Sequence, residues 1–259
     1  MSFDPAIERV RLSRLKWFAR SPAHFWDPPQ PATKGTLDKG SAVHSVLLKG
    51  ARVTYYDKVT EAGAAAPRRG KDWDAFQAAN QGALILSRAE YDVTQRAVDA
   101  VRANGEAMEL LTGKIEDTIE FSFLGLPCRT TPDARTPTTV VELKTTRSAA
   151  PLDFAWQSKK LLYHAQMAFH IEGMATVNPS LNPTPYVVAV EMSKPYCVQV
   201  YRMPAPIILA GHRLVRGWFE QLRGCLASGN FPGYAQAAME LELPGSEAVV
   251  FDDEEDAAA

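Results

Sequence analysis

The most constraining feature of the sequence is the run Val140-Val141-Glu142-Leu143-Lys144, which sets two charged residues two positions apart in an apolar, β-branched segment. Such a segment predicts a β-strand, in which alternate side chains point to opposite faces. Glu142 and Lys144 are therefore expected to share one face, with Val141 and Leu143 on the other. Because the run is too apolar to be plainly a surface strand, the charged pair needs a partner.

A second carboxylate precedes this strand at the strand-breaking step Pro132-Asp133. A hairpin-like step would bring Asp133 alongside Glu142 and Lys144 at one edge of a sheet. Burying three such ions without compensation is costly, and a divalent cation held by the two carboxylates would relieve their repulsion. Hard oxygen ligands favour Mg²⁺ or Mn²⁺. The alternative is a surface Glu–Lys pair with Asp133 capping a turn, and spacing alone does not separate the two.

Hydrophobic periodicity and turn residues predict the remaining elements. Helices are expected over 10–19, from about 38 to 50, and from about 73 to 111 with an interruption near 82–87; residues 61–71 are expected to form a loop. Strands are expected over 115–125, 126–133 and 138–146, then a helix over 152–174, a strand pair at 185–193 and 196–204, and a helix over 206–228. This order predicts an α/β fold with a central mixed sheet flanked by helices.

The length of 259 residues suits one large domain, which we expect to span 1–251. Its helical part would cover about 1–112 and its sheet core about 113–230. The content of 46% apolar and 22% charged residues is that of a soluble globular protein. No run approaches a membrane span, and the start of the chain is too charged for a secretory signal. Three scattered cysteines, Cys128, Cys197 and Cys225, favour a reduced, cytoplasmic protein.

The net charge of −2 does not indicate nucleic-acid binding, because proteins that bind nucleic acids usually carry a net positive charge. Five acids, however, lie in the segment 252–259, which is expected to be a disordered acidic tail. Without them the remainder has a charge of +3, from −2 plus 5. A DNA site would therefore be a local basic groove on a mildly acidic body.

Pro132-Asp133, eight further residues and then Glu142-Leu143-Lys144 resemble the PD-(D/E)xK nuclease motif. The wider string LPCRTTPDARTPTTVVELKTTRSA resembles the RecE-type, or exonuclease VIII-like, exonucleases and more distantly the phage lambda exonuclease group. Three outer segments match that family in kind and order, so the resemblance covers roughly residues 10–230: LKWFARSPAHFW, LDKGSAVHSVLLKG and YHAQMAFHIEGM. It implies a restriction-endonuclease-like core.

The resemblance also implies roles for individual residues. Asp133, Glu142 and the Leu143 carbonyl would hold one or two Mg²⁺ or Mn²⁺ ions, and His44, in the pattern Gly40-x-x-x-His44, would be a further ligand. Lys144 would orient or deprotonate a water or neutralise developing charge. Without the resemblance, a histidine in an apolar helix is more often a hydrogen-bonded core residue.

A polar stripe follows the motif, because Lys159, Tyr163, Gln166 and His170 are spaced by 4, 3 and 4 residues. On one helix these side chains would share a face, lying beside the cation site or facing solvent. In the related family this helix carries Q-x-x-x-Y. Gln166 matches the glutamine, whereas His170 stands at the tyrosine position.

Further candidates follow from the resemblance and, for some basic residues, from position near the motif. The resemblance favours Glu116 over Glu120 as a further acid that helps to hold the site. It also implies that a basic loop grips a DNA strand, and the alternative is a solvated loop. The candidate phosphate contacts are Arg68, Arg69 and Lys71 in that loop, with Arg135, Arg147, Lys159 and Lys160 nearer the motif.

The RecE-type resemblance implies an exonuclease of a bacterial or phage-infected cell that digests the 5′-ended strand of linear duplex DNA. The 3′ single strands left behind would pass to a single-strand annealing protein in recombination. Relatives form trimer or tetramer rings, so a homo-oligomer is expected. Three alternatives stay open: a structure-specific or Cas4-like endonuclease, a non-catalytic DNA-binding module, and a non-nuclease α/β domain. An iron–sulfur cluster needs four cysteines and is not expected with three.

Overall fold

The computed structural model describes residues 8–29, 39–60, 66–235 and 237–239. The predicted acidic tail at 252–259 lies outside these residues, as does Asp38 at the expected start of the second helix. Helices dominate the first part of the described chain: α1 (Leu12–Leu15), the 3-10 helix η1 (Lys16–Ala19), α2 (Pro22–Trp26), α3 (Lys39–Lys49), α4 (Lys71–Ala79), α5 (Arg88–Ala103) and α6 (Gly105–Leu110).

The central sheet has the strand order β3-β6-β7-β8-β9. Its strands are β3 (Lys114–Ile115), β6 (Ala134–Arg135), β7 (Thr139–Thr146), β8 (Thr184–Glu191) and β9 (Val198–Arg202). β7 and β8 pair in parallel, whereas the other neighbours pair antiparallel. The parallel pair is joined by α7 (Pro151–Leu161) and α8 (Tyr163–Val177), as a parallel connection requires. The predicted mixed sheet flanked by helices is confirmed.

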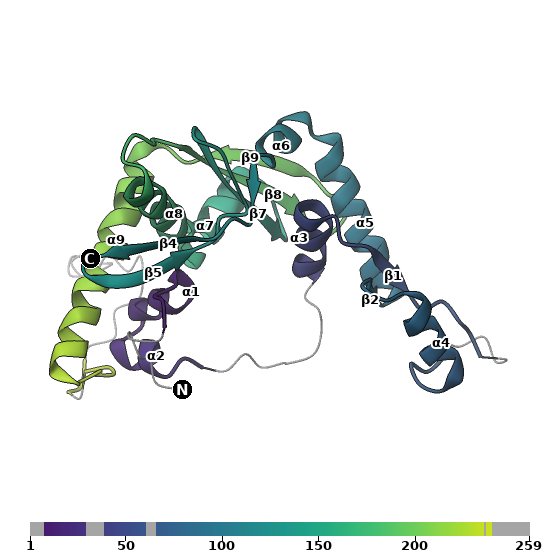
Figure 1. Cartoon of the computed structure of the whole chain (residues 1–259), viewed down its shortest axis with the longest axis horizontal. Helices are drawn as coiled ribbons and strands as arrows, with labels where there is room; N and C mark the ends of the chain where they lie inside the picture. The colour runs from purple at the N-terminus through teal and green to yellow at the C-terminus, as the bar shows by residue number, and fades with distance from the viewer. Residues whose placement is uncertain (1–7, 30–38, 61–65, 236, 240–259) are drawn as a thin grey trace, which may run out of the picture.

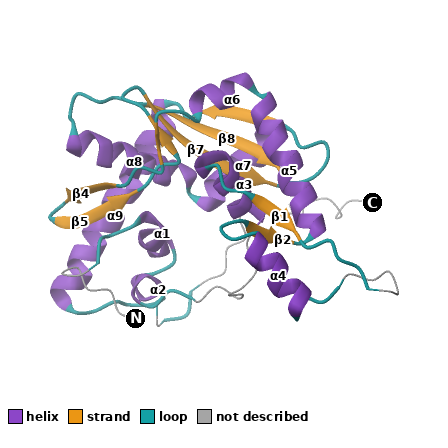
Figure 2. Ribbon diagram, turned by 45° about the vertical axis from the view of Figure 1, so that its right-hand side comes forward, coloured by secondary structure: helices purple, strands orange, loops and turns teal. Residues whose placement is uncertain are grey.

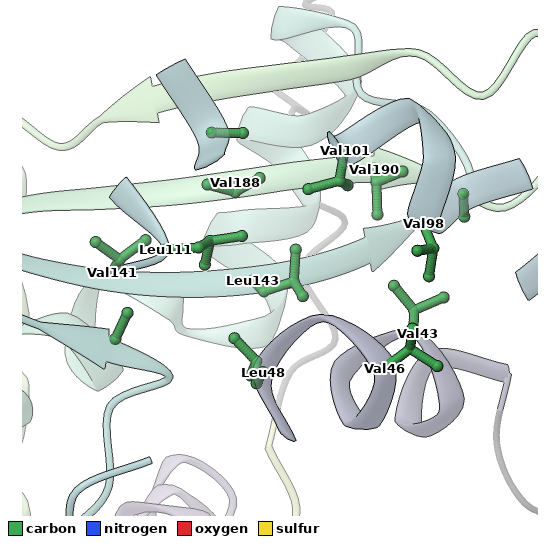
Figure 3. Close-up of a cluster of buried hydrophobic side chains, with 13 residues drawn as sticks. Val43, Val46, Leu48, Val98, Val101, Leu111, Val141, Leu143, Val188 and Val190 are labelled. Carbon is green, nitrogen blue, oxygen red and sulfur yellow. The ribbon is translucent and has the colours of Figure 1, made fainter. Parts of the chain in front are cut away.

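The two faces of the sheet are covered by different helices. Val141 and Leu143 of β7 are fully buried in a cluster with side chains of β8, α3 and α5 (Figure 3). On the opposite face, Val187 and Ala189 of β8 pack with Phe154 of α7 and with α8. The alternation expected for β7 is therefore present, and its Glu142 and Lys144 face the side that α8 covers.

The hairpin of β4 (Ile119–Phe123) and β5 (Leu126–Thr130) departs from expectation because it forms a separate sheet. It turns at Gly125, as predicted, and lies beside α8 and α9 (Ala205–Ser228) in Figure 2. Phe121 packs on Phe169 of α8 with ring centroids 5.2 Å apart. A Cβ at Gly173 of α8 would lie 2.9 Å from Thr130 Cγ2, so the hairpin sits tightly on this helix instead of joining the central sheet.

The helix predicted over 152–174 is broken in two. Leu162 adopts a left-handed conformation with φ of 61°, which ends α7 and begins α8 on a new axis. α8 then packs closely on α9, where a Cβ at Gly211 would lie 2.2 Å from the carbonyl oxygen of His164. The prediction that four polar residues form one stripe on a single helix is therefore wrong for Lys159, which lies on α7, whereas the other three residues lie on α8.

The helical region expected from about 73 to 111 contains a strand at its interruption. β2 (Leu84–Leu86) pairs in parallel with β1 (Val53–Tyr55), and this small sheet lies with α4 at the end of the molecule opposite α9 (Figure 1). Trp73 and Phe76 of α4 pack against Tyr56. Among the described residues, no helix is both long and apolar enough to cross a membrane.

Candidate active site

Glu142 and Lys144 form a close ion pair on the α8 side of β7. Lys144 Nζ lies 2.6 Å from Glu142 Oε2, and the side chains are 17% and 4% exposed, respectively. Strand alternation places both on one face, as the sequence predicted. This pair is buried, which excludes the alternative of a surface Glu–Lys pair.

Asp133 lies directly before β6, at the edge where β6 stops pairing with β7. Its Oδ2 accepts a 2.7 Å hydrogen bond from the Leu143 backbone N–H. The N–H and C=O of one strand residue point to the same side, so the Leu143 carbonyl faces the same edge. The antiparallel step between β6 and β7 thus brings Asp133 alongside the Glu142–Lys144 segment, as expected.

His44 approaches Asp133 from α3, on the other face of the sheet. Its Nδ1 lies 3.7 Å from Asp133 Oδ1, and its side chain is 27% exposed. His44 and Lys144 also line one cavity of about 440 Å³, together with Glu116, Thr145 and Tyr163. His44 is therefore a partly exposed site residue that shares a cavity with Lys144.

Three residues of α8 surround the Glu142–Lys144 pair. Gln166 Nε2 donates a 2.8 Å hydrogen bond to Glu142 Oε2, and Lys144 Nζ lies 5.1 Å from the centre of the Tyr163 ring. His170 Nε2 lies 2.8 Å from the other carboxylate oxygen, Oε1, without hydrogen-bond geometry. The polar residues of α8 therefore face the pair and not solvent.

The pKa values of the two carboxylates, Glu142 and Asp133, are shifted in opposite directions. Burial raises the pKa of Glu142, but the neighbouring Lys144 and then His170 outweigh it and bring the pKa to about 2. Burial, with the nearby charge of Glu142, raises the pKa of Asp133 above its ordinary value. Burial also lowers the pKa of Lys144, but Glu142 and Asp133 more than compensate and leave it raised. Lys144 is therefore a cation in this arrangement.

The donor set fits a hard divalent cation. Asp133 and Glu142 supply two buried carboxylates that repel each other, and the Leu143 carbonyl faces the same edge. Glu142 Oε1 has no hydrogen bond of regular geometry among the described residues, and its near neighbour is His170 Nε2 at 2.8 Å, so a bound cation would share this oxygen with the imidazole. No three His, Cys, Asp or Glu side chains in that part of the chain converge as a ready-made metal cluster. A cation would thus rely on backbone or water oxygens beside the two acids.

Two other predicted contacts are engaged with neighbouring side chains. Glu116 follows β3, lines the His44 cavity and forms a 2.8 Å ion pair with Lys49. Arg135 is hydrogen-bonded and ion-paired to Asp117, and its side chain is 17% exposed. Arg135 is thus ion-paired with Asp117 in this structure, and its contact with phosphate stays a prediction.

The predicted basic loop lies apart from this cluster. Arg68 donates to the Leu86 carbonyl and stacks over Trp73 of α4. Arg69 and Lys71 are exposed on the same part of the molecule. None of these three lines the cavities around Glu142, so their proposed DNA contact would lie outside the reaction centre.

Lys159 of α7 and Arg147, just after β7, lie close to the motif in sequence. Lys159 lies over the Trp156 ring at 5.4 Å, away from the Tyr163–Gln166–His170 face, because the chain turns at Leu162. Arg147, just after β7, lines a cavity with Trp156 and Tyr163. Lys159 lines none of the three described cavities beside Glu142 and Lys144, and the phosphate contacts of Arg147 and Lys159 stay predictions.

Sequence reasoning missed two residues that contact or approach the site. Thr130 Oγ1, at the end of β5, is hydrogen-bonded at 2.5 Å to His170 Nδ1, the ring nitrogen that does not face Glu142. Lys16 of η1 lines a cavity with Arg129, Gln166 and His170. Burial and then the charge of Lys144 lower its pKa, which places the two ammonium groups in electrostatic reach. Neither residue carried a local sequence signal, because each reaches the site only through tertiary packing.

A family model described as "PDDEXK-like domain of unknown function (DUF3799)" matches residues 12–242. The chain belongs to this family. None of the curated proteins matches its sequence. Asp133, Glu142 and Lys144, which the sequence predicts to form a PD-(D/E)xK motif, lie together at the edge of β7 in this DUF3799 domain.

Solved structures agree with a PDDEXK-like fold. A protein of Eubacterium rectale named "Putative exonuclease" superposes with a TM-score of 0.61 over 92% of this chain and 90% of its own, at 13% identity. At that identity the likeness concerns the fold. An alkaline exonuclease of Laribacter hongkongensis is also 13% identical, over 72% of this chain and 89% of its own, with a TM-score of 0.33. The second score is too low to support a comparison of arrangement.

Proposed function

We propose that this DUF3799 domain is a metal-dependent DNA nuclease that hydrolyses phosphodiester bonds at the edge of β7. The observation that carries the proposal is the buried meeting of Asp133, Glu142 and Lys144, with one Glu142 oxygen lacking a hydrogen bond among the described residues. An isolated arrangement of this kind is costly to bury and gives no evident gain in stability. A site that binds a cation and an anionic substrate explains why the charges are kept.

Each residue has a role that follows from its position. Asp133, Glu142 and the Leu143 carbonyl would hold one or two Mg²⁺ or Mn²⁺ ions. His44 would be a further ligand. When bound, such a cation activates water and neutralises charge on a phosphate. Lys144, kept protonated by its two acidic neighbours, would place positive charge on the scissile phosphate. Gln166 would hold Glu142 through its amide and orient a water or the phosphate.

For the substrate we propose linear duplex DNA, digested from the 5′ end to leave 3′ single strands. Two considerations support an exonuclease: the RecE-type resemblance of the motif segments, and the fold shared with the protein named "Putative exonuclease". A cavity lined by Arg11, Lys16 and Arg129 next to Gln166 offers positive charge to a DNA strand. A ring of three or four subunits and transfer to an annealing protein belong to the same proposal.

One assay tests both the chemistry and the polarity. A linear duplex is labelled at the 5′ end and, separately, at the 3′ end, and is incubated with Mg²⁺ or with EDTA. We expect the 5′ label to be released as a mononucleotide before the 3′ label, only with Mg²⁺. A closed circular duplex should not be cut. Cleavage of the circle would instead identify an endonuclease of the structure-specific or Cas4-like kind. Binding without cleavage in any metal would identify a non-catalytic DNA-binding module.

A further inference from the structure

Trp156 is an exposed aromatic residue on the rim of the candidate active site. It lies on α7 with its residue 63% exposed, even though Lys159 sits over the ring. Around it is a cavity of about 730 Å³ that Arg147, Lys160 and Leu161 also line. A large indole exposed to this degree beside several cations contributes little to the core, so its position needs another explanation.

The Trp156 cavity adjoins the reaction centre. It shares Thr145 and Tyr163 with the cavity of His44 and Lys144. Leu161 lines both the Trp156 cavity and the cavity that contains Lys16, Gln166 and His170. The cavity of Lys144 and the cavity of Trp156 are therefore adjacent, and a chain molecule bound at Lys144 has a continuous path to Trp156.

The charged side chains that line this cavity are all positive. No acidic side chain is among its described lining residues, whereas Arg147 and Lys160 contribute two cations. The neighbouring carboxylates Asp153 and Glu191 do not line it: Asp153 accepts from the Ser148 hydroxyl, and Glu191 accepts from the Ala149 and Cys197 backbone N–H groups. Cations beside an aromatic face are the two elements with which proteins bind single-stranded nucleic acid.

We infer that Trp156 stacks against a nucleobase of the strand being cut, while Arg147 and Lys160 bind its neighbouring phosphates. This inference rests on the proposed nuclease function and specifies the form of its substrate. A base inside a duplex is already stacked on both sides and its edges are paired, whereas an unpaired nucleotide can turn its face to the indole. The enzyme would therefore act on the frayed or peeled end of a strand, and a single-stranded end would bind more tightly than a blunt one.

The test pairs a protein change with a nucleotide change. Binding of 5′-phosphorylated oligothymidylate is measured in EDTA, with one abasic nucleotide placed at each position in turn. For the unmodified oligonucleotide, Trp156→Ala should weaken binding by roughly 5- to 150-fold, the range for one stacked base. Trp156→Phe should retain part of the affinity. Leu209→Ala, a truncation of another exposed apolar residue, 51% exposed on α9, is the matched control and should bind as the wild type does.

The decisive result is the coupling between the two changes. In the wild type an abasic nucleotide at one position should weaken binding by a similar factor, and in Trp156→Ala the same abasic nucleotide should have no further effect. The inference is overturned if Trp156→Ala binds as the wild type does, or if the abasic penalty is unchanged in the variant. Because EDTA removes cleavage from the assay, a coupled result stands even if no nuclease activity is found.

Discussion

His170 Nε2 lies 2.8 Å from Oε1 of Glu142, across the gap between α8 and β7. Lys144 and Gln166 hold the other carboxylate oxygen at 2.6 and 2.8 Å. The residue that stands in place of the tyrosine expected from the family resemblance therefore lies against Glu142 directly. Thr130 fixes the far side of the ring, so the histidine is a positioning residue for this carboxylate.

Replacing His170 should disturb the orientation of Glu142 more than its charge. His170→Ala should lower Mg²⁺ affinity or turnover by roughly 10- to 100-fold, the usual effect of losing a group that orients a metal ligand. Thr130→Val keeps the shape but removes the contact to Nδ1, and it should give a smaller loss in the same direction. Calorimetric Mg²⁺ affinity and kcat are the measurements. Unchanged values in both variants would reduce His170 to a packing residue.

Lys144→Ala should leave the fold and Mg²⁺ binding intact while lowering turnover by two to four orders of magnitude, roughly the contribution of a positioned charge or proton-transfer group. Folding should survive because Gln166 still donates to Glu142 Oε2. Circular dichroism and calorimetry check the first part, and single-turnover cleavage of duplex DNA checks the second. Unchanged turnover would remove the lysine from the mechanism.

Metal binding should strengthen with rising pH because Asp133 holds its proton more tightly than an ordinary aspartate. Apparent Mg²⁺ affinity should increase as the pH rises through the raised pKa of Asp133, with release of up to one proton. Asp133→Asn should abolish this dependence together with most of the affinity. Calorimetry in buffers of different ionisation enthalpy measures the proton count. A flat profile across the acidic range would contradict a raised pKa at a metal-binding Asp133.

The same pKa shifts act on stability in opposite directions without metal. The Glu142 pKa is depressed from 4.5 to about 2, so its contribution is present above pH 4.5 and lost as the pH falls toward 2. The Asp133 pKa is raised, so its contribution is present below the ordinary pKa of an aspartate and lost as the pH rises through the raised value. Urea unfolding of Asp133→Asn should therefore lose the second dependence and keep the first.

Two glycines of α9 should respond oppositely to alanine. At Gly211 a Cβ would lie 2.2 Å from the His164 carbonyl oxygen, so Gly211→Ala must push α8 from α9 and should destabilise the fold by about 1–3 kcal/mol. At Gly217 nothing lies within 4 Å, and alanine there should stabilise the helix by about 0.5–1 kcal/mol. Thermal unfolding measures both. Equal effects at the two positions would contradict the close packing of α8 on α9.

Local patterns predicted the parts of the site that depend on strand geometry. Alternation along β7 places Glu142 and Lys144 together, and the step after Asp133 brings it to Leu143, as expected. Patterning could not show the break at Leu162, since no glycine or proline marks it and its left-handed conformation accompanies the packing of α8 on α9. Lys159 was placed on the wrong helix for that reason.

Contacts between segments distant in sequence could not be predicted from local sequence patterns, for a different reason. The β4–β5 hairpin was expected to join the sheet, yet its aromatic face packs on α8 instead. That packing brings Thr130 to His170, 40 residues away in sequence. Lys16 likewise reaches the charge of Lys144 only in the folded chain. Periodicity reports which face of an element is apolar, but not which of several apolar surfaces it will meet.

The central claim is that Asp133 and Glu142 hold a divalent cation, and calorimetric titration with Mg²⁺ in the absence of DNA tests it most directly. The wild-type protein should bind one or two ions, and Glu142→Gln should lose at least tenfold in affinity while unfolding at a similar temperature. Glu120→Gln removes a surface acid that pairs with Arg9, so it should bind Mg²⁺ as the wild type does. Equal Mg²⁺ affinity in wild type and Glu142→Gln would contradict the account.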